Sequence, residues 1–371
     1  MKKKILFFHY DLKGGGAERV LINLLQHLDY TKYDVTLKTI FGAGPHVKNI
    51  PKEVKFKYLF RYEFYGFNLV MKLLPPRFWH WLLIKDKYDI EIGYLENAPT
   101  RIVSACPNKE TKKVSWLHIE INERRTMFIG YRNEKEMLDC FNKLDHLVFV
   151  AKRTQECFEK LFPEVKLPMS VIHNVNDFDR IYRLAEQESP IELSPSDLKI
   201  CAVNKLTKTK GFHRLIAACS KLKQEGLMED VKIYILGKGI EKFALKQAID
   251  KADLNNHIKL MGFDPNPYRT LSKMDLFVCT SYREGYSTAV TEAVALGVPV
   301  FTTDCSGMEE ILEDGKFGMI VPNKDNAIYE GLKDLLTHRE KIKQYADAIS
   351  QAPRMTTQRL VDEYEKFFDS L

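Results

Sequence analysis

Two glutamates in the second half of the chain, Glu284 and Glu292, frame a stretch that could bind a phosphate group. An apolar run ending at Cys279 predicts a strand and the residues from about Thr288 predict a helix, with Gly285 in the turn between them. A helix N-terminus offers unpaired backbone N–H groups and roughly half a positive charge, which attract phosphate. Glu292 could then accept hydrogen bonds from ribose hydroxyls, and Glu284 would lie beside a sugar. Such a pair alone is common on solvated helix faces, so its meaning depends on its neighbours.

Two lysines, Lys205 and Lys210, supply the positive charge that such a site needs. They follow a strand predicted at Lys199 to Val203 and precede a helix predicted from about Gly211. Because α/β sheets bind ligands at the carboxyl ends of their strands, two cations and a helix N-terminus would converge there. This combination suits a diphosphate; the alternative is a solvated basic loop.

A glycine-rich loop, Gly14-Gly15-Gly16, follows the first predicted strand and opens the first predicted helix. Its flexible backbone could lie against a ligand. It is not a dinucleotide fingerprint, because G-x-G-x-x-G would require glycine where Arg19 stands, and no Walker A spacing occurs.

His118 also follows a predicted strand and could donate a hydrogen bond to a sugar hydroxyl, although a lone histidine is usually structural. Asp177-Phe178-Asp179 has the D-x-D form of metal-dependent transferases, but it stands at the start of the predicted hinge region and we interpret it as accidental. The sequence has no H-E-x-x-H motif, EF-hand loop or clustered histidines, so it implies no metal.

The composition is that of a globular protein. At 371 residues the chain predicts about two domains, and 45% hydrophobic with 29% charged residues is neither a disordered nor a membrane-spanning composition. The apolar run Ile5 to Phe8 is too short for a signal peptide and predicts a first strand. The seven cysteines of the chain are scattered without a C-x-x-C pair, which favours a reducing cytoplasm. The net charge of +6 is mild and no nucleic-acid-binding module is recognisable, so we predict no nucleic-acid partner.

Short apolar runs alternate twice with longer amphipathic runs, which is typical of βαβ units and parallel sheets. We predict an α/β protein with two doubly wound, Rossmann-like domains, residues 1–184 and 198–354, facing across a cleft. The polar segment 185–197 would be the linker. The C-terminal helix at 355–371 would return to the first domain.

The segment Phe60 to Tyr88 departs from its surroundings, because aromatic and basic side chains alternate in it. Such a surface could rest on anionic lipid headgroups, where aromatic rings lie at the interface and lysines add electrostatic attraction. The alternative is that the aromatic residues pack in a domain core. The sequence leaves both interpretations open.

The motifs together resemble the family 4 retaining glycosyltransferases, which have the GT-B fold, over almost the whole chain. Val203 to Leu215 is similar to the family's Arg/Lys-Leu…Lys-Gly motif, and Ile235 to Gly239 is similar to its Gly-x-Gly turn. Leu260 to Phe263 resembles its base-contacting loop, and Glu284 to Glu292 its paired-glutamate signature. The stretch Gly14 to Arg19 resembles the N-terminal loop of members that build bacterial surface glycans.

The resemblance implies a role for each matching residue. Lys205 and Lys210 would hold the diphosphate and stabilise the leaving nucleotide, with Glu284 and His118 at the reacting sugar. The remaining contacts to the donor would come from Gly15, Gly16, Phe263, Gly285, Tyr286, Ser287 and Glu292. Lys205 stands where arginine is frequent, so the charge is kept but a bidentate fork is lost. Tyr286 stands where phenylalanine is usual.

The resemblance also implies a hexosyltransferase-type reaction that requires no cofactor. A sugar would pass from a nucleoside diphosphate, expected to be UDP, to a hydroxyl of a glycan or lipid-linked oligosaccharide in capsule, exopolysaccharide or O-antigen biosynthesis. The acceptor would attack from the leaving-group face and a phosphate oxygen would take its proton. The enzyme would be cytoplasmic and peripheral on the inner face of the plasma membrane. Two alternatives remain open, a nucleotide-sugar epimerase and a non-catalytic nucleotide-sugar-binding protein.

Overall fold

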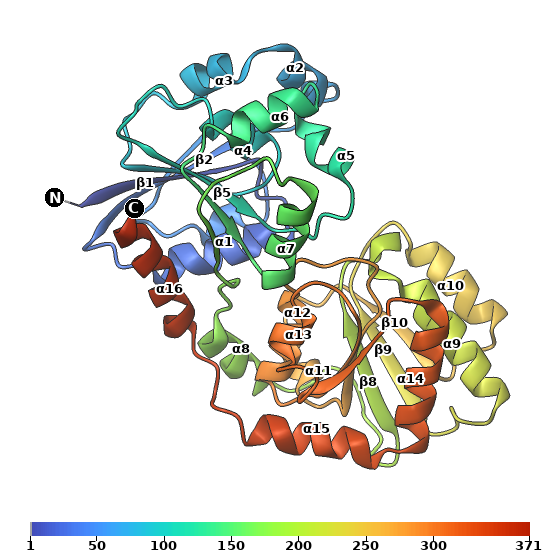
Figure 1. Cartoon of the computed structure of the whole chain (residues 1–371). Coiled ribbons are helices and arrows are strands. Elements are labelled where there is room, and N and C mark those ends of the chain that lie inside the picture. Colours follow the sequence, from blue (N-terminus) through green and yellow to red (C-terminus); the bar gives the residue numbers. More distant parts are fainter. Residues whose placement is uncertain (1) are drawn as a thin grey trace. The chain divides into compact units, whose positions relative to one another are not determined.

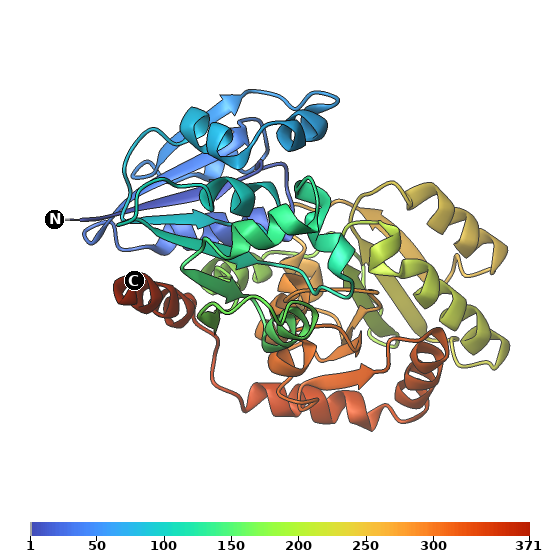
Figure 2. The same cartoon turned by 45° about the horizontal axis from the view of Figure 1, so that its top comes forward.

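The computed structural model describes residues 2–371 and divides the chain into two compact units. The first unit comprises the chain up to Asn176 together with Thr357–Leu371, and the second comprises Asp177–Thr356. Each unit is built on a parallel β-sheet with helices around it (Figures 1 and 2). The predicted α/β class with two parallel-sheet domains is confirmed.

The first unit has the strand order β3-β2-β1-β4-β5-β6-β7, and neighbouring strands are parallel. Its strands are β1 (Lys3–His9), β2 (Tyr33–Phe41), β3 (Lys55–Phe60), β4 (Ile90–Gly93), β5 (Lys112–Leu117), β6 (His146–Phe149) and β7 (Met169–Val171). Its α-helices are α1 (Gly16–His27), α2 (Phe67–Leu73), α3 (Pro76–Leu83), α4 (Ala98–Val103), α5 (Arg124–Met127), α6 (Glu134–Phe141), α7 (Lys152–Leu161) and α16 (Thr357–Ser370). Short 3₁₀ turns occur at η1 (Val47–Asn49) and η2 (Phe128–Gly130).

The second unit has the strand order β10-β9-β8-β11-β12-β13, again with parallel neighbours. Its strands are β8 (Leu198–Val203), β9 (Val231–Leu236), β10 (Ile258–Gly262), β11 (Leu276–Cys279), β12 (Val300–Thr303) and β13 (Gly318–Val321). Its helices are α8 (Phe178–Ala185), η3 (Lys208–Lys210), α9 (Phe212–Gln224), α10 (Lys242–Lys251), α11 (Tyr268–Leu271), α12 (Thr288–Ala295), α13 (Met308–Ile311), α14 (Asp325–Thr337) and α15 (Glu340–Ser350).

Each sheet has one point at which the chain reverses its direction across the sheet. In the first unit this point lies between β1 and β4, and in the second between β8 and β11. Ligands of open α/β sheets bind beyond the carboxyl ends of the strands at such points. The loops after these four strands are therefore the expected ligand-binding loops.

The boundary between the units lies earlier in the chain than predicted. Residues up to 184 were assigned to the first domain, whereas α8 belongs to the second unit. Asp177 caps this helix by accepting a hydrogen bond from the Arg180 amide at 3.0 Å, so the helix starts directly where the first unit ends. The carbonyl of Leu184 then accepts a hydrogen bond from the Asn266 side chain at 2.9 Å, which attaches α8 to the second unit.

The C-terminal helix α16 packs in the first unit beside α1 (Figure 1). The ring of Tyr364 stacks on Trp116 with 4.7 Å between centroids. The ammonium of Lys32 lies 2.9 Å from the carboxylate of Glu365. A buried aromatic stack and an ion pair thus fix the last helix of the chain to the first sheet.

Candidate functional site

The residues predicted to bind a diphosphate lie on two loops of the second unit. Strands β8 and β11 are parallel neighbours, so their carboxyl ends meet at the same edge of the sheet. Lys205 and Lys210 lie on the loop after β8, and Glu284 lies on the loop after β11. The amide of Tyr282 donates a hydrogen bond to the carbonyl of Thr209 at 2.8 Å, which joins the two loops.

Lys210 and Glu284 form a bidentate ion pair. The Lys210 Nζ lies 2.7 Å from Oε1 and 2.8 Å from Oε2 of Glu284, and the Ser281 hydroxyl donates to Oε1 at 2.6 Å. The two side chains are 21% and 10% exposed. The pair is therefore largely shielded from water, which strengthens its electrostatic interaction and holds the ammonium in one place.

The Gly-x-Gly turn supports the loop that carries Lys205. A Cβ at Gly237 would lie 1.8 Å from the carbonyl oxygen of Asn204, and one at Gly239 would lie 2.2 Å from that of Leu206. Gly237 also has a φ of 150°, which side chains rarely permit. The two glycines thus let one loop lie directly on the other and leave the side chain of Lys205 exposed.

Arg214, which the sequence analysis did not identify, braces the same loops. Its side chain is buried, and its guanidinium donates to Asp325 Oδ1 at 2.7 Å and to Asn323 Oδ1 at 2.6 Å. It also lies 4.3 Å from the ring centroid of Tyr282, three residues after β11. Gly211 permits this arrangement, since a Cβ there would lie 2.0 Å from the carbonyl oxygen of Thr280. Arg214 acts as a positioning residue for the loop of Glu284.

The N-terminus of α12 differs in one respect from the prediction. Ser287 is its N-cap, and the hydroxyl accepts the backbone N–H of Val290 at 3.4 Å, so one of the N–H groups is already used. Glu292 is buried and accepts a hydrogen bond from the Tyr268 hydroxyl at 3.0 Å. Gly285 and Tyr286 pack on Gly307, where a Cβ would lie 2.9 Å from the Gly285 carbonyl oxygen.

Phe263 presents an exposed aromatic ring beside the Gly-x-Gly turn. It follows β10, and the ammonium of Lys238 lies 4.8 Å from its ring centroid. The Gly237 amide donates to the carbonyl of Gly262 at 2.7 Å, which joins the two loops. An exposed ring in this position is suited to stacking with a flat heterocycle.

The first unit has a pocket of about 480 Å³ where β1 and β4 end. Its polar lining includes His9, Asp11, Glu18, Asn68, Lys72 and Asn97. Gly15 is the N-cap of α1, and a Cβ there would lie 2.1 Å from the Glu18 carboxylate. Gly16, the first residue of α1, has open space where a Cβ would stand.

His9 closes β1 and was missed by the sequence analysis. Its Nδ1 lies 2.6 Å from the carbonyl oxygen of Asp11. A carbonyl oxygen can only accept, so Nδ1 carries the proton and Nε2 is left as an acceptor. Within residues 2–371 this Nε2 has no hydrogen-bond partner, and neither does Asn97 Oδ1. Burial lowers the pKa of His9, which favours the neutral ring.

His118 follows β5 and lies against the same group of rings. Its ring centroid is 4.6 Å from that of Tyr94, and Tyr94 is 6.4 Å from His9. Burial, with a smaller effect of His9, lowers the pKa of His118 to about 3. His118 is therefore neutral near pH 7, and in the described part of the chain its Nε2 also lacks a partner.

Residues 185–354, most of the second unit, match the family model described as glycosyl transferases group 1. The second unit is therefore similar to the glycosyl transferases group 1. The N-acetylgalactosamine-N,N'-diacetylbacillosaminyl-diphospho-undecaprenol 4-alpha-N-acetylgalactosaminyltransferase of Campylobacter jejuni is 29% identical over 360 residues, 92% of this chain and 93% of that protein. The putative colanic acid biosynthesis glycosyltransferase WcaL of Escherichia coli is 33% identical over 144 residues, 37% of this chain and 35% of that protein.

Solved structures show the fold. Anabaena HepE in complex with UDP superposes with a TM-score of 0.74 at 20% identity, covering 100% of both chains. TarM of S. aureus, in a complex that contains UDP, has a TM-score of 0.70 at 15% identity and covers 99% of both chains. The chain therefore has the GT-B fold, as predicted.

Other features of the chain bear on metals and membranes. Asp177 of the D-x-D sequence serves as the cap of α8. Among the described residues, His80, Glu91 and Cys106 bring possible metal-ligand atoms within 4.8 Å of one another; His80 Nε2 lies 2.9 Å from the Glu91 carboxylate, which joins α3 to β4. Within residues 2–371, none of the helices combines the length and apolar character needed to cross a bilayer.

Proposed function

We propose that this chain is a glycosyltransferase that transfers a sugar from a UDP-sugar to a hydroxyl of a lipid-linked glycan in bacterial polysaccharide biosynthesis, with retention of configuration and without a metal. The observation that carries the proposal is the shielded Lys210–Glu284 pair on the loops after β8 and β11. The relative from C. jejuni is named for a diphospho-undecaprenol-linked substrate, and the HepE structure contains UDP. The name of the relative supports a lipid-linked acceptor, and the bound UDP supports a nucleotide-sugar donor.

The chemistry assigned to the second unit is charge stabilisation. As the bond between the anomeric carbon and the phosphate oxygen breaks, negative charge grows on the departing diphosphate. Lys205, Lys210 and backbone N–H groups of the loop at Gly285 would stabilise that charge more strongly than they stabilise the bound donor. A bound diphosphate would draw the ammonium of Lys210 partly away from Glu284. The freed carboxylate oxygen of Glu284 could then accept a hydrogen bond from a hydroxyl of the sugar. Phe263 would stack on the uracil and Glu292 would hold the ribose.

The first unit would hold the acceptor. Its pocket offers hydrogen-bond acceptors, the Nε2 of His9 and the Oδ1 of Asn97, together with the carboxylates of Asp11 and Glu18. Lys72 is the cation of this lining, and with two carboxylates and two neutral acceptors against one ammonium the lining favours neutral hydroxyl groups over phosphates. The acceptor oxygen would bond to the anomeric carbon on the face that the phosphate leaves, and a phosphate oxygen would take its proton.

A transfer assay followed by NMR tests the proposal. The purified protein is incubated with a UDP-sugar, alone and with a lipid-linked glycan, in the presence and absence of EDTA. We expect an acceptor-dependent product with the anomeric configuration of the donor and an unchanged rate in EDTA. An inverted product or a rate abolished by EDTA contradicts retention or metal independence, respectively. Epimerised donor without an acceptor indicates an epimerase, and UDP binding without turnover indicates a binding protein.

A further inference from the structure

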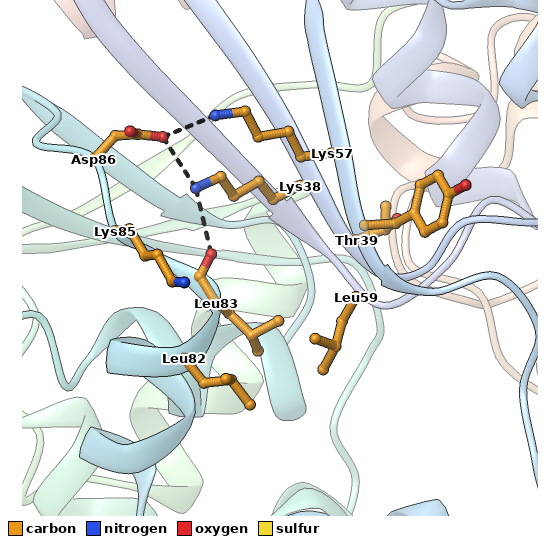
Figure 3. A pocket seen from close by; sticks show the side chains of 9 residues that line it. Lys38, Thr39, Lys57, Leu59, Leu82, Leu83, Lys85 and Asp86 are labelled. Carbon is orange, nitrogen blue, oxygen red and sulfur yellow. Dashed lines mark hydrogen bonds and ion pairs between the residues drawn. The ribbon is translucent and has the colours of Figure 1, made fainter.

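A second, smaller pocket in the first unit has a basic lining. It has a volume of about 240 Å³ and lies between the ends of β2, β3 and α3 (Figure 3). None of the residues assigned to transfer lines it. The lining consists of Lys38, Thr39, Lys57, Tyr58, Leu59, Leu82, Leu83, Lys85 and Asp86.

Positive charge exceeds negative charge in this pocket. Three lysines line it, and the carboxylate of Asp86 is the acidic group of the lining. Asp86 Oδ2 is shared, at 3.3 Å from the Lys38 Nζ and 3.1 Å from the Lys57 Nζ. Figure 3 shows the ammonium of Lys85 on the same side of the pocket as these groups, with Thr39 and Leu59 on the other side. One carboxylate is thus the acidic group among three lysines, so the pocket keeps a net positive charge.

Lys38 is the buried lysine of the three, whereas the other two are exposed. The side chain of Lys38 projects from β2 and the residue is 5% exposed, and burial lowers its pKa. Its Nζ has contacts of 3.3 Å both to Asp86 and to the carbonyl oxygen of Leu83. Charge-assisted hydrogen bonds to an ammonium are usually about 2.7–2.9 Å. The Lys38 ammonium also lies 5.6 Å from the ring centroid of Tyr88. A buried ammonium whose hydrogen bonds are both long is a position where an additional anionic oxygen would be stabilised.

Part of the pocket lining belongs to the aromatic segment Phe60 to Tyr88. Some aromatic rings of this segment are buried in the core and others are exposed. Trp79 is 3% exposed and packs in the core, as one interpretation predicted, whereas Trp81 is 67% exposed. Phe78 is partly exposed on the same helix, and its ring centroid lies 6.0 Å from that of Trp81. Tyr58, in the pocket lining, is also exposed. Exposed rings beside a cationic pocket are the combination that favours the surface of an anionic bilayer.

We propose that the Lys38–Lys57–Lys85 pocket binds the phosphate of an anionic lipid headgroup, with Trp81 and Phe78 at the bilayer interface beside it. The ligand is a phosphodiester carried by a membrane. The proposal deepens the proposed function, since a lipid-linked acceptor would be met at a membrane. Binding is measured without donor or turnover, so its failure is distinguishable from a failure of transfer.

Vesicle sedimentation of the full chain tests the site. The probes are phosphatidylcholine vesicles with and without phosphatidylglycerol. The variant is Lys57→Gln/Lys85→Gln, in which both altered side chains are exposed. The matched control is Lys109→Gln/Lys112→Gln, which removes the same charge from exposed positions of the same unit. We expect the pocket variant to lower partitioning onto phosphatidylglycerol vesicles at least tenfold, and the control to lower it less than twofold.

Three results would overturn the proposal. One is equal loss in the pocket variant and the control, which would indicate diffuse surface charge. Another is wild-type partitioning without any preference for phosphatidylglycerol. The third is saturable binding of inorganic phosphate that depends on Lys57 and Lys85 but is not displaced by the vesicles, which would make the pocket a site for a soluble anion. Transfer to a short, soluble acceptor should stay at the wild-type rate in the pocket variant, since neither lysine lies among the residues assigned to transfer.

Discussion

The two units place a different balance of charge at the same position of a similar sheet. Beyond β8 and β11 the second unit offers the ammonium groups of Lys205 and Lys210, the latter paired with Glu284. Beyond β1 and β4 the first unit offers an imidazole nitrogen, an amide oxygen and two carboxylates, with the ammonium of Lys72 in the same pocket. The fold thus determines where a ligand can bind, and the loops determine which ligand. A donor that carries phosphates suits the former set, and a neutral acceptor rich in hydroxyls suits the latter.

The largest effect is expected from closing the space above Gly237. In Gly237→Ala the new Cβ would meet the Asn204 carbonyl oxygen at 1.8 Å in a backbone conformation with a φ of 150°. The loop of Lys205 would have to move, and we expect a loss of at least 2 kcal/mol in the free energy of unfolding. Donor binding should disappear. Denaturant unfolding and calorimetry with UDP measure both, and Gly226→Ala, where a Cβ meets open space at a φ of 74°, is the matched control for backbone strain without a clash.

The next largest effect is expected from removing a positive charge from the second unit. Lys210→Ala should lower turnover at least tenfold, about 1.4 kcal/mol, because an ammonium facing the departing phosphate is lost. The affinity for the acceptor should change little. Lys246→Ala, which removes an exposed lysine of the same unit, is the control. Near-normal turnover in Lys210→Ala would remove the basis for treating the second unit as the cationic half of the comparison.

The strands at the centre of each sheet were easier to predict from the sequence than those at its edges. Central strands such as β1 and β11 are continuous apolar runs and were predicted. Of the four edge strands, β10 was predicted at Ile258 to Met261, whereas β3, β7 and β13 were not. β3 alternates lysine with aromatic residues, so it lacks the apolar signal of a buried parallel strand. An edge strand is specified by its neighbour, which a single sequence does not contain.

The same limit applies to the candidate site. Residues in glycine-rich or basic motifs were found, because their types are unusual next to a strand. Arg214 was missed because its partners Asp325 and Asn323 are more than a hundred residues away along the chain. His9 could have been found, since it is a polar residue that ends an apolar first strand, the rule that was applied to the loops after β8 and β11.

Acid pH should act first on the first unit. The pKa of His118 is about 3 in the folded chain, well below the ordinary value of 6.5, because of its burial and the nearby His9. The unfolded chain therefore binds the proton more readily, and the stability present above pH 6.5 is lost as the pH falls toward 3. The slope from this group has an upper limit of about 1.4 kcal/mol per pH unit. Denaturant unfolding between pH 7 and pH 5 should show a shallower slope in His118→Gln; an unchanged slope contradicts the buried neutral ring.

The smallest expected effect tests which of the two substrates the first unit binds. His9→Leu removes a hydrogen-bond acceptor from the first unit, and we expect the KM for the acceptor glycan to rise about fivefold, the value of one neutral hydrogen bond. The KM for the UDP-sugar should stay unchanged, whereas Lys205→Ala should show the reverse pattern. Since His9 is buried, its replacement could also lower stability, so Glu18→Gln is tested beside it as a variant at a less buried lining position. A rise in the KM for the donor in both first-unit variants would mean that this pocket binds part of the nucleotide sugar, and the division of the two substrates between the units would have to be abandoned.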